Sequence, residues 1–468
     1  MTGQPTTRLH VGGYRFLVRR MEHALVRGDT RMLDDPLRAQ SLSLAVGAVL
    51  AAVAVVACAV LALLRPAGEL GDAAIVMVRE TGAMYVRIGD TIHPVDNLAS
   101  ARLIAGTPAD PRIVGQRAVD NAHRGPQVGI PGAPETISPP LTPEDSAWTV
   151  CDDARGETTV IAGALADSAV TSGQSVLVTP RGGSAATTYL LSGGHRARVD
   201  LRHHAVVRAL RLDGIAPRPI SPAVLSALPE APEIAPPHIP EAGTPGPQAL
   251  RGHPVGTVVK VPRANADSVG GADYFAVLAD GLQRIGEVAA DLIRYTDSRV
   301  GEQIPTVSPG AIGALPVVDT LPVTTFPEHG GVTDDPVLCA RWRVDPGGDG
   351  SGAGVLVGQA TPTAGRPVAL AQADADGPAV DAVSLPAGRS AFVCSVGLTG
   401  GGQSTGSLFL VTDSGVLFGI RDLDAARSLG LTVPAQPSPW PVLALLPRGP
   451  ELSQSGASVA RDGIVASP

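Results

Sequence analysis

The sequence is poor in lysine and in aromatic side chains. Lys260 is its single Lys, and Phe, Trp and Tyr together make up 3% of its 468 residues. Together with a net charge of −8, this argues against a nucleic-acid-binding protein, which needs clustered positive charge. Because aromatics are scarce, the cores must be built from Val, Leu, Ile and Ala.

The usual signatures of catalysis are also missing. The sequence contains no G-x-x-x-x-G-K-[ST] phosphate loop and no C-x-x-C pair, so it predicts neither a Walker-type nucleotide site nor dithiol redox chemistry. Residues 402–406 match G-x-S-x-G, but the strand follows this motif instead of preceding it, unlike a nucleophile elbow. His195, His203 and His204 lack zinc-ligand spacing, so we predict no metal site.

One long apolar run divides the chain. From Leu42 to Leu64 the sequence has 23 residues with no charge and no Pro. About 20 such residues cross a hydrocarbon core in helical form, so we predict one transmembrane helix. A cleaved signal peptide is the alternative, but 41 residues precede the run and Leu63-Leu64-Arg65 is not a small-residue cleavage site.

Charge on either side of this run predicts its orientation. Residues 1–41 contain seven Arg and four acids, a net charge of +3, so with −8 overall the remainder carries −11. Basic residues next to a span stay in the cytoplasm. We therefore expect a single-pass protein of the inner (plasma) membrane, with a cytosolic head (1–41) and a periplasmic body.

The head contains an amphipathic helix of about 14 residues that ends at Gly28. Its apolar residues recur at helical spacing and its Arg residues fill the other faces. The helix would bind anionic lipid or a partner's cytosolic domain, or would only set the topology. We expect the following residues to form an assembly interface: Tyr14, Arg15, Leu17, Arg19, Arg20, Met21 and Leu25.

The body has the pattern of a repeat protein. An aromatic strand, a Gly turn, a second strand and a short helix recur in the same order four times, and Ser-Pro or Asp-Pro follows each. Two of these tails, Ser221–Pro229 and Ser308–Pro316, are nearly identical. The predicted repeats cover residues 72–125, 185–229, 270–316 and 405–447.

Two insertions and a linker separate the repeats. Each insertion, 146–180 and 331–398, has one Cys near a Trp, and we expect the two to form one mainly-β central domain on a pseudo-two-fold axis. A Pro-rich linker (230–256) joins the second and third repeats, and a tail (448–468) ends the chain. The predicted fold class is α+β: one N-terminal transmembrane helix, then an elongated body of four α/β repeats flanking the central domain.

Of the four cysteines, Cys58 lies in the apolar run and three lie in the body. Three thiols allow three pairings and leave one over. The mirrored contexts Trp148-x-x-Cys151 and Cys339-x-x-Trp342 favour a disulfide between Cys151 and Cys339, which is stable outside the cytoplasm. Cys394, in an apolar strand, is expected to be buried and free.

One run near the N-terminus, from Gly13 to Arg27, reads GYRFLVRRMEHALVR. Distinctive stretches of the body are Gly125-Pro126, Val128 to Pro134 (VGIPGAP), Trp148 with Val150-Cys151-Asp152, Glu241 to Pro245 (EAGTP) and Pro439-Trp440-Pro441. Together these stretches resemble the EccB family, the single-span membrane components of type VII (ESX) secretion systems of mycobacteria and their relatives, and the resemblance is strongest in the N-terminal run.

This resemblance implies a structural core subunit of the secretion membrane complex. It also implies partners: the motor ATPase EccC, EccD, EccE, the mycosin protease and further EccB copies in the periplasm. The family is sometimes labelled an ATPase, so ATP is a cofactor by that label alone and no residues follow from it. Two alternatives therefore stay open, a nucleotide-hydrolysing component and a cell-wall-binding anchor.

Overall fold

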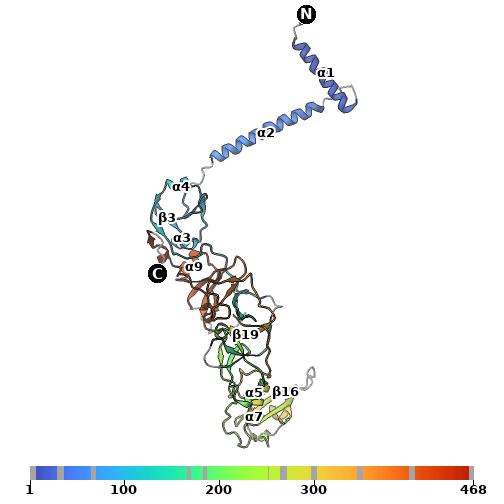
Figure 1. The fold of residues 1–468 in the computed structure, drawn as a ribbon, viewed down its shortest axis with the longest axis vertical. Coiled ribbons are helices and arrows are strands. Elements are labelled where there is room, and N and C mark those ends of the chain that lie inside the picture. Colours follow the sequence, from blue (N-terminus) through green and yellow to red (C-terminus); the bar gives the residue numbers. More distant parts are fainter. Residues whose placement is uncertain are drawn as a thin grey trace. The chain divides into compact units, whose positions relative to one another are not determined.

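A computed structural model describes most of the chain in two units, residues 1–69 and 70–468 (Figure 1). The described residues are 7–28, 36–64, 70–165, 170–182, 187–250, 252–263, 271–296, 303–344, 351–399 and 406–462. Residues 402–405 of the G-x-S-x-G match lie outside them.

The first unit contains two helices. α1 (Arg8–Arg27) has 20 residues, longer than predicted because it continues through Gly12 and Gly13. It ends where expected, at Gly28, whose positive φ of 67° allows its N–H to bond the Ala24 carbonyl. α2 (Pro36–Leu64) contains the apolar run, and within the described residues it is the one helix long and apolar enough to cross a membrane.

The second unit is a mixed α/β structure whose described strands form five sheets. The first sheet has the order β26-β6-β3-β2-β1-β4, with β5 also paired to β3. Helix α3 packs on it, and its N-cap Asn97 accepts a bond from the Ser100 N–H. The elements are β1 (Ile75–Val78), β2 (Met84–Ile88), β3 (Thr91–Val95), α3 (Leu98–Ala105), β4 (Arg112–Val114), α4 (Gln116–Asp120), β5 (His123–Arg124), β6 (Gln127–Val128) and β26 (Ala460–Arg461).

The second and third sheets pack together through helices α5 and α7. The second sheet has the order β13-β10-β11-β12-β14 and the third β15-β16-β17. Their elements are β10 (Val176–Pro180), β11 (Tyr189–Ser192), β12 (His195–Arg198), α5 (His204–Ala209), β13 (Arg218–Ile220), α6 (Pro222–Ser226), β14 (Glu230–Ala231), η1 (Gln248–Leu250), β15 (Val258–Pro262), β16 (Ala272–Val277), β17 (Leu282–Ile285), α7 (Glu287–Thr296) and α8 (Pro309–Gly313).

The fourth sheet, β24-β23-β22-β25, contacts the first through helices α9 and α3. Apolar side chains from both, including Leu103 and Leu429, form one buried cluster. The elements are β22 (Ala391–Val396), β23 (Leu408–Val411), β24 (Leu417–Ile420), α9 (Leu423–Leu429), β25 (Gln436–Pro439), α10 (Trp440–Leu443) and α11 (Gln454–Ala457).

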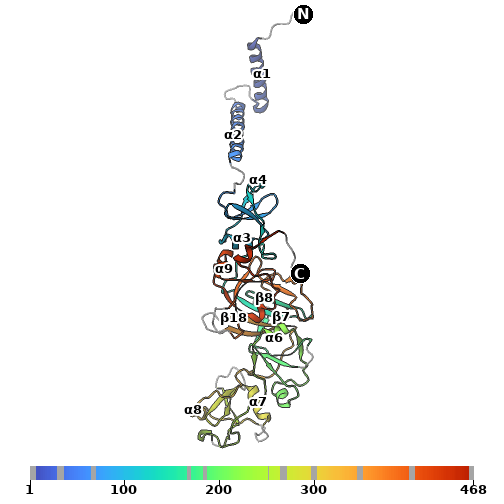
Figure 2. The ribbon, with the colours of Figure 1, turned by 90° about the vertical axis from the view of Figure 1, so that its left-hand side faces the viewer.

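The central sheet lies between the second and fourth sheets, and Figure 2 shows β7, β8, β18 and α6 gathered there. Its order is β20-β21-β8-β7-β18-β19-β9, so strands from two distant parts of the chain alternate in it. The elements are β7 (Ala147–Asp152), β8 (Thr158–Ala162), β9 (Val170–Ser172), β18 (Val337–Val344), β19 (Ser351–Gly358), β20 (Val368–Ala369) and β21 (Ala382–Ser384).

Two strands that we assigned to the central domain pair elsewhere. β10 pairs with β11 in the second sheet, and β22 pairs with β23 in the fourth. Both are apolar strands, and an apolar pattern marks a buried strand without identifying its neighbour.

The segments predicted as linker and tail also have ordered contacts. In 230–256, Ile234, Leu250 and Val255 are buried and β14 joins the second sheet. In 448–468, the side chain of Leu452 is buried and β26 pairs with β6 of the first sheet. The sequence did not predict these contacts, because the first segment is rich in Pro, the second is short, and neither has a periodic apolar pattern.

Candidate functional site

The central sheet is built around one antiparallel pair, β7 and β18. Their register places Trp148 opposite Trp342 and Cys151 opposite Cys339. Successive side chains of a strand point to opposite faces, so residues three apart in sequence lie on different faces. The Trp pair therefore faces one side of the sheet and the Cys pair the other.

The Cys face carries a disulfide. The Cys151 and Cys339 sulfurs are bonded at 2.08 Å, their Cα atoms are 4.0 Å apart, and both residues are fully buried. Ile161, Val337 and Leu356 pack around them. The bond links strands 188 residues apart in sequence, so it holds together the two separate segments of the central sheet.

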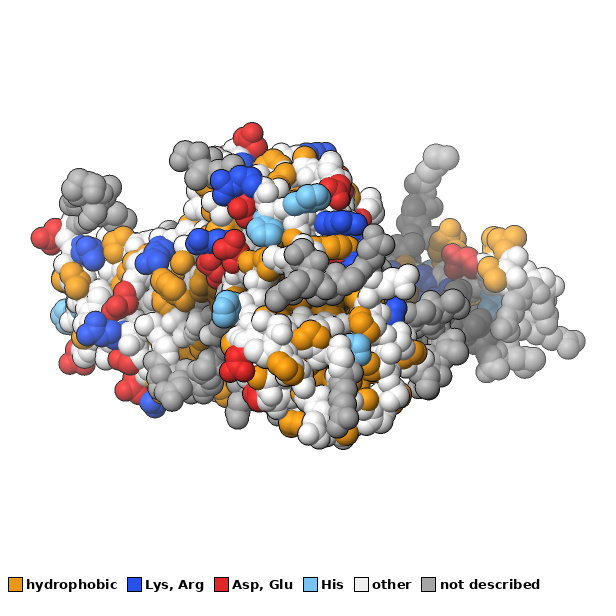
Figure 3. Space-filling view, turned by 90° about the horizontal axis from the view of Figure 1, so that it is seen from below, with side chains coloured by type: hydrophobic (Ala, Val, Ile, Leu, Met, Phe, Trp, Pro, Cys, Tyr) orange, Lys and Arg blue, Asp and Glu red, His pale blue; other side chains and the backbone are white. Residues whose placement is uncertain are grey.

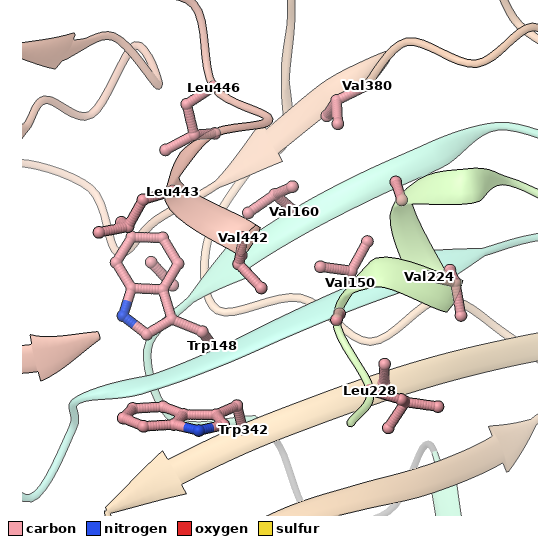
Figure 4. Packing of buried hydrophobic residues seen from close by; sticks show 14 of the residues in the cluster. Trp148, Val150, Val160, Val224, Leu228, Trp342, Val380, Val442, Leu443 and Leu446 are labelled. Atoms are coloured by element: carbon pink, nitrogen blue, oxygen red, sulfur yellow. The ribbon is translucent and has the colours of Figure 1, made fainter. Parts of the chain in front are cut away.

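The Trp face is covered by two short helices, α6 from the second sheet and α10 following the fourth sheet (Figure 4). Val224 and Leu228 approach from the α6 side, and Val442 and Leu443 from α10. The two helices also contact each other. This cluster is the largest apolar core of the body and joins three sheets.

A buried carboxylate fixes α6 to β7. The side chain of Asp152 is 1% exposed and accepts bonds from the Ser221 N–H (2.6 Å) and Oγ (2.7 Å), from Thr158 Oγ1 (2.9 Å) and from Arg181 Nη2 (3.3 Å). Buried charge is tolerated when it is paired and fully hydrogen-bonded, as it is here. The sequence placed Ser221 at the start of a Ser-Pro tail and Asp152 in a stretch that resembles the EccB family, but it did not indicate that the two residues would meet.

A second polar bond fixes the β25–α10 segment to β7. The indole N–H of Trp148 donates to Ser438 Oγ at 2.7 Å, and both side chains are buried. Trp342, opposite Trp148, donates instead to the Leu398 carbonyl at 3.1 Å. Polar contacts thus determine where the covering helices sit on the central sheet.

Helix α1 presents an exposed apolar surface. Tyr14, Leu17, Met21 and Leu25 are 71%, 55%, 65% and 85% exposed. Arg15, Arg19 and Arg20 are exposed as well. The structure therefore places all seven predicted interface residues on one exposed helix, and nothing in the described part of the chain covers the four apolar ones.

The apolar helix α2 is equally uncovered. Its candidate span, Leu42–Val60, has a mean hydropathy of 2.6, and none of it is buried within the protein. Cys58 in this span is exposed and free. An uncovered helix this apolar is suited to a lipid environment.

The described residues contain no group of three or more His, Cys, Asp or Glu side chains arranged to hold a metal. Lys260 lies inside β15, where its backbone bonds Pro305 and Val307 instead of forming a phosphate loop. A cavity of about 540 Å³ beside the central sheet has mixed charge, with Arg155, Arg181 and Arg218 beside Asp334. Arg181 and Arg218 donate to backbone carbonyls, so these two guanidiniums serve the fold.

Shifted pKa values follow packing and ion pairs. Arg263 and, to a smaller extent, Arg284 donate hydrogen bonds to the Asp273 carboxylate and lower the pKa of Asp273. Arg263 directly follows β15, Asp273 lies in β16 and Arg284 in β17, so these bonds also link the three strands of the third sheet. Burial raises the pKa of Asp291 although Arg294 lies 2.8 Å away. Burial likewise raises the pKa of the free Cys394 thiol. None of these groups lines the cavity described above.

These features define a class: a membrane-anchored protein with one candidate span and an α/β body joined through a disulfide-linked central sheet. Residues 3–466 match the family model described as "Type VII secretion system ESX-1, transport TM domain B". The chain is 39% identical to the "ESX-3 secretion system ATPase EccB3" of Mycolicibacterium smegmatis, over 99% of this chain and 92% of the relative. The chain belongs to the EccB family of type VII secretion systems.

Solved structures agree with this assignment. A chain of an intact ESX-5 inner membrane complex matches with a TM-score of 0.70 and 32% identity, covering 100% of this chain and 98% of that one. A chain of the periplasmic assembly from the ESX-5 complex matches at 0.67 and 33%, covering 86% and 100%. The EccB3 dimer from the ESX-3 core complex matches at 0.69 and 35%, covering 83% and 100%.

Proposed function

We propose that this protein is a structural core subunit of a type VII secretion membrane complex. One observation carries the proposal: the similarity to a chain of an intact ESX-5 inner membrane complex covers 100% of this chain and 98% of that one. In this role α2 anchors the subunit in the inner membrane and the body builds the periplasmic part of the complex.

The orientation follows from charge. Residues 1–41 carry +3 and the remainder −11, which favours a cytosolic head and a periplasmic body. The exposed apolar face of α1 would then meet the cytosolic parts of EccC, EccD or EccE, or anionic lipid. In the periplasm the body would meet the mycosin protease and further copies of this chain.

We further propose that the body consists of four α/β repeats. In three sheets, a three-stranded meander and a helix precede a strand that returns parallel to the first strand: β4 to β1, β13 to β10 and β25 to β22. In the third sheet, Thr306 makes the same parallel return to Lys260. The shared plan supports repeats at 72–125, 185–229, 270–316 and 405–447, the last three each extended by the strand before it (β10, β15 and β22).

A pseudo-two-fold axis through the β7–β18 pair is part of this proposal. An axis there would place like residues opposite each other, which agrees with the paired Trp148 and Trp342 and the bonded Cys151 and Cys339. It would also relate α6 to α10, which cover the same face of the sheet.

The experiment changes the exposed apolar face of α1 and keeps its Arg residues. Replacing Tyr14, Leu17, Met21 and Leu25 by Ser should abolish incorporation into the membrane complex, read by native gels. The Cys151–Cys339 disulfide should still form, read by non-reducing electrophoresis, because the charge of the head and hence the orientation are retained. A complex that assembles normally around this variant would show that the head does not dock the subunit.

Nucleotide hydrolysis is the second candidate, since the M. smegmatis relative bears the name ATPase. It is tested with the purified full chain freed of contaminating ATPases, where turnover above buffer would support it. A cell-wall anchor is the third candidate, and retention of the chain on isolated peptidoglycan would support it.

A further inference from the structure

Helix α1 has an apolar stripe along much of its length. Tyr14, Leu17, Met21 and Leu25 follow each other at spacings of three, four and four residues, so they lie on one side of the helix. They are 55–85% exposed, and nothing in the described part of the chain covers them. A continuous row of exposed apolar side chains marks a surface that another apolar phase or molecule covers.

Basic side chains border this stripe on both sides. A helix turn takes 3.6 residues, so Arg15 and Arg19 lie to one side of the stripe and Arg20 to the other. All three are exposed. Neither they nor Arg8 have an ion-pair partner among the described residues. Residues 8–27 contain five Arg and one Glu, a net charge of +4, so this charge is not neutralised within the helix.

The body provides a contrast, because several of its Arg residues have a counter-charge in the chain. Arg211 pairs with Glu287 and Arg263 pairs with Asp273, both at 2.8 Å. Figure 3 shows the side of the second unit that carries α5 and α7, where basic and acidic side chains are mixed over the surface. The exposed guanidiniums of α1 have no such partner, so their counter-charge lies outside the described chain.

The length of the connection keeps α1 close to the membrane. Residues 28–35 separate α1 from α2. Even fully extended, eight residues reach only about 27 Å. With α2 across the membrane, the end of α1 therefore stays within reach of the lipid headgroups, on the side that the charge of the head makes cytosolic.

Stripe, flanks and short connection together favour a lipid surface. An anionic leaflet offers an apolar layer beneath a plane of phosphates. A helix lying in this plane buries its stripe while Arg side chains on both flanks extend to the phosphates. A protein groove would match the helix only if it carried acidic side chains on both rims and lay within the same short reach.

We propose that α1 lies flat on the cytosolic leaflet of the inner membrane and binds anionic phospholipid. The stripe enters the acyl region, and Arg15, Arg19 and Arg20 contact lipid phosphates. Phe16, off the stripe, then faces the cytosol, and the membrane holds the head in a fixed position for the other subunits. The inference rests on the proposed function, since it requires α2 to span the membrane.

The test uses the full chain in lipid vesicles, in a Cys58→Ser background that removes the exposed thiol of α2. Leu17→Cys and Met21→Cys are labelled with a fluorophore that brominated acyl chains quench. In vesicles containing one-third phosphatidylglycerol, we expect at least threefold more quenching at both positions than at Phe16→Cys. Phe16 is the matched control, because it is 55% exposed like Leu17 but lies off the stripe. Equal quenching at all three positions would overturn the proposal.

A charge variant provides an independent measurement. Replacing Arg15, Arg19 and Arg20 by Gln keeps good helix formers and removes three positive charges. Each basic residue near an anionic surface strengthens binding severalfold. Quenching at Leu17→Cys should therefore fall at least threefold in this variant, and also when the vesicles contain phosphatidylcholine alone. Quenching that is insensitive to both changes would contradict binding of anionic phospholipid.

Failure of this inference is distinguishable from failure of the proposed function, because the vesicles contain no other subunit. In cells, a photo-cross-linking side chain in place of Met21 should capture lipid. Capture of another subunit instead would overturn the lipid contact and leave the proposed function standing. If the parent contacts lipid in vesicles but never enters a secretion complex, the proposed function fails and the lipid contact stands.

Discussion

The disulfide between β7 and β18 gives the sharpest test of how the body is held together. Replacing both cysteines, Cys151→Ala with Cys339→Ala, removes the cross-link without leaving a reactive thiol. The bond constrains a separation of 188 residues in the unfolded chain. In the chain-entropy model such a loop is worth about 5 kcal/mol at 25 °C, which is an upper figure because native-state effects reduce it.

We therefore expect the free energy of unfolding of the double variant to be about 3–5 kcal/mol lower than that of the parent. The measurement is urea unfolding of the detergent-solubilised full chain without reductant, followed by Trp fluorescence. That signal reports on the central core because Trp148 and Trp342 are buried in it. Adding reductant should lower the stability of the parent and leave the double variant unchanged.

Cys58→Ser serves as the control, because Cys58 is free and exposed in α2. It should leave the Trp transition of the body unchanged. The reasoning would be refuted if the free energy of unfolding of the double variant lay within about 1 kcal/mol of the parent's value. The β-ladder and the cluster on the Trp face would then suffice to join the two segments of the central sheet.

Three further predictions concern other contacts of the body. Asp152→Asn should lower the free energy of unfolding, measured with urea, by about 3 kcal/mol, because Arg181 loses its buried counter-charge. Ending the chain at Gly449 removes the buried side chains of Leu452 and Ala457, and should cost at least about 3 kcal/mol in the same assay. The pKa of Asp273 is lowered in the folded state, so its stabilisation is present above the unfolded value of about 3.9 and is lost as pH falls through the folded pKa. Asp273→Asn should therefore reduce the fall in melting temperature between pH 5 and pH 3.

Local structure was predictable from the sequence wherever it follows from near neighbours. The end of α1 at Gly28 follows from the left-handed conformation that glycine accepts. The apolar run of α2 followed from length and composition alone. These features depend on residues within a few positions of each other.

The sequence did not indicate which strands and segments would pair. β10 and β22 looked like members of the central sheet, but their partners are β11 and β23. The carboxylate of Asp152 gained its importance only when Ser221, 69 residues away, was brought to it. Such contacts depend on register and topology, which hydrophobic patterning does not encode.

The charge of the head and the disulfide of the body support the same orientation, with a cytoplasmic N-terminus and an exported body, by two independent physical arguments. Positive charge in the head favours a cytoplasmic N-terminus through its effect on membrane insertion. A buried disulfide favours a body on the oxidising side of the membrane, because cytoplasmic thiols are kept reduced. The α2 helix lies between these two regions of sequence. In the proposed orientation, a body linked across 188 residues by an oxidised bond would be completed only after it had crossed the membrane, so the helix would insert before the central sheet is covalently closed.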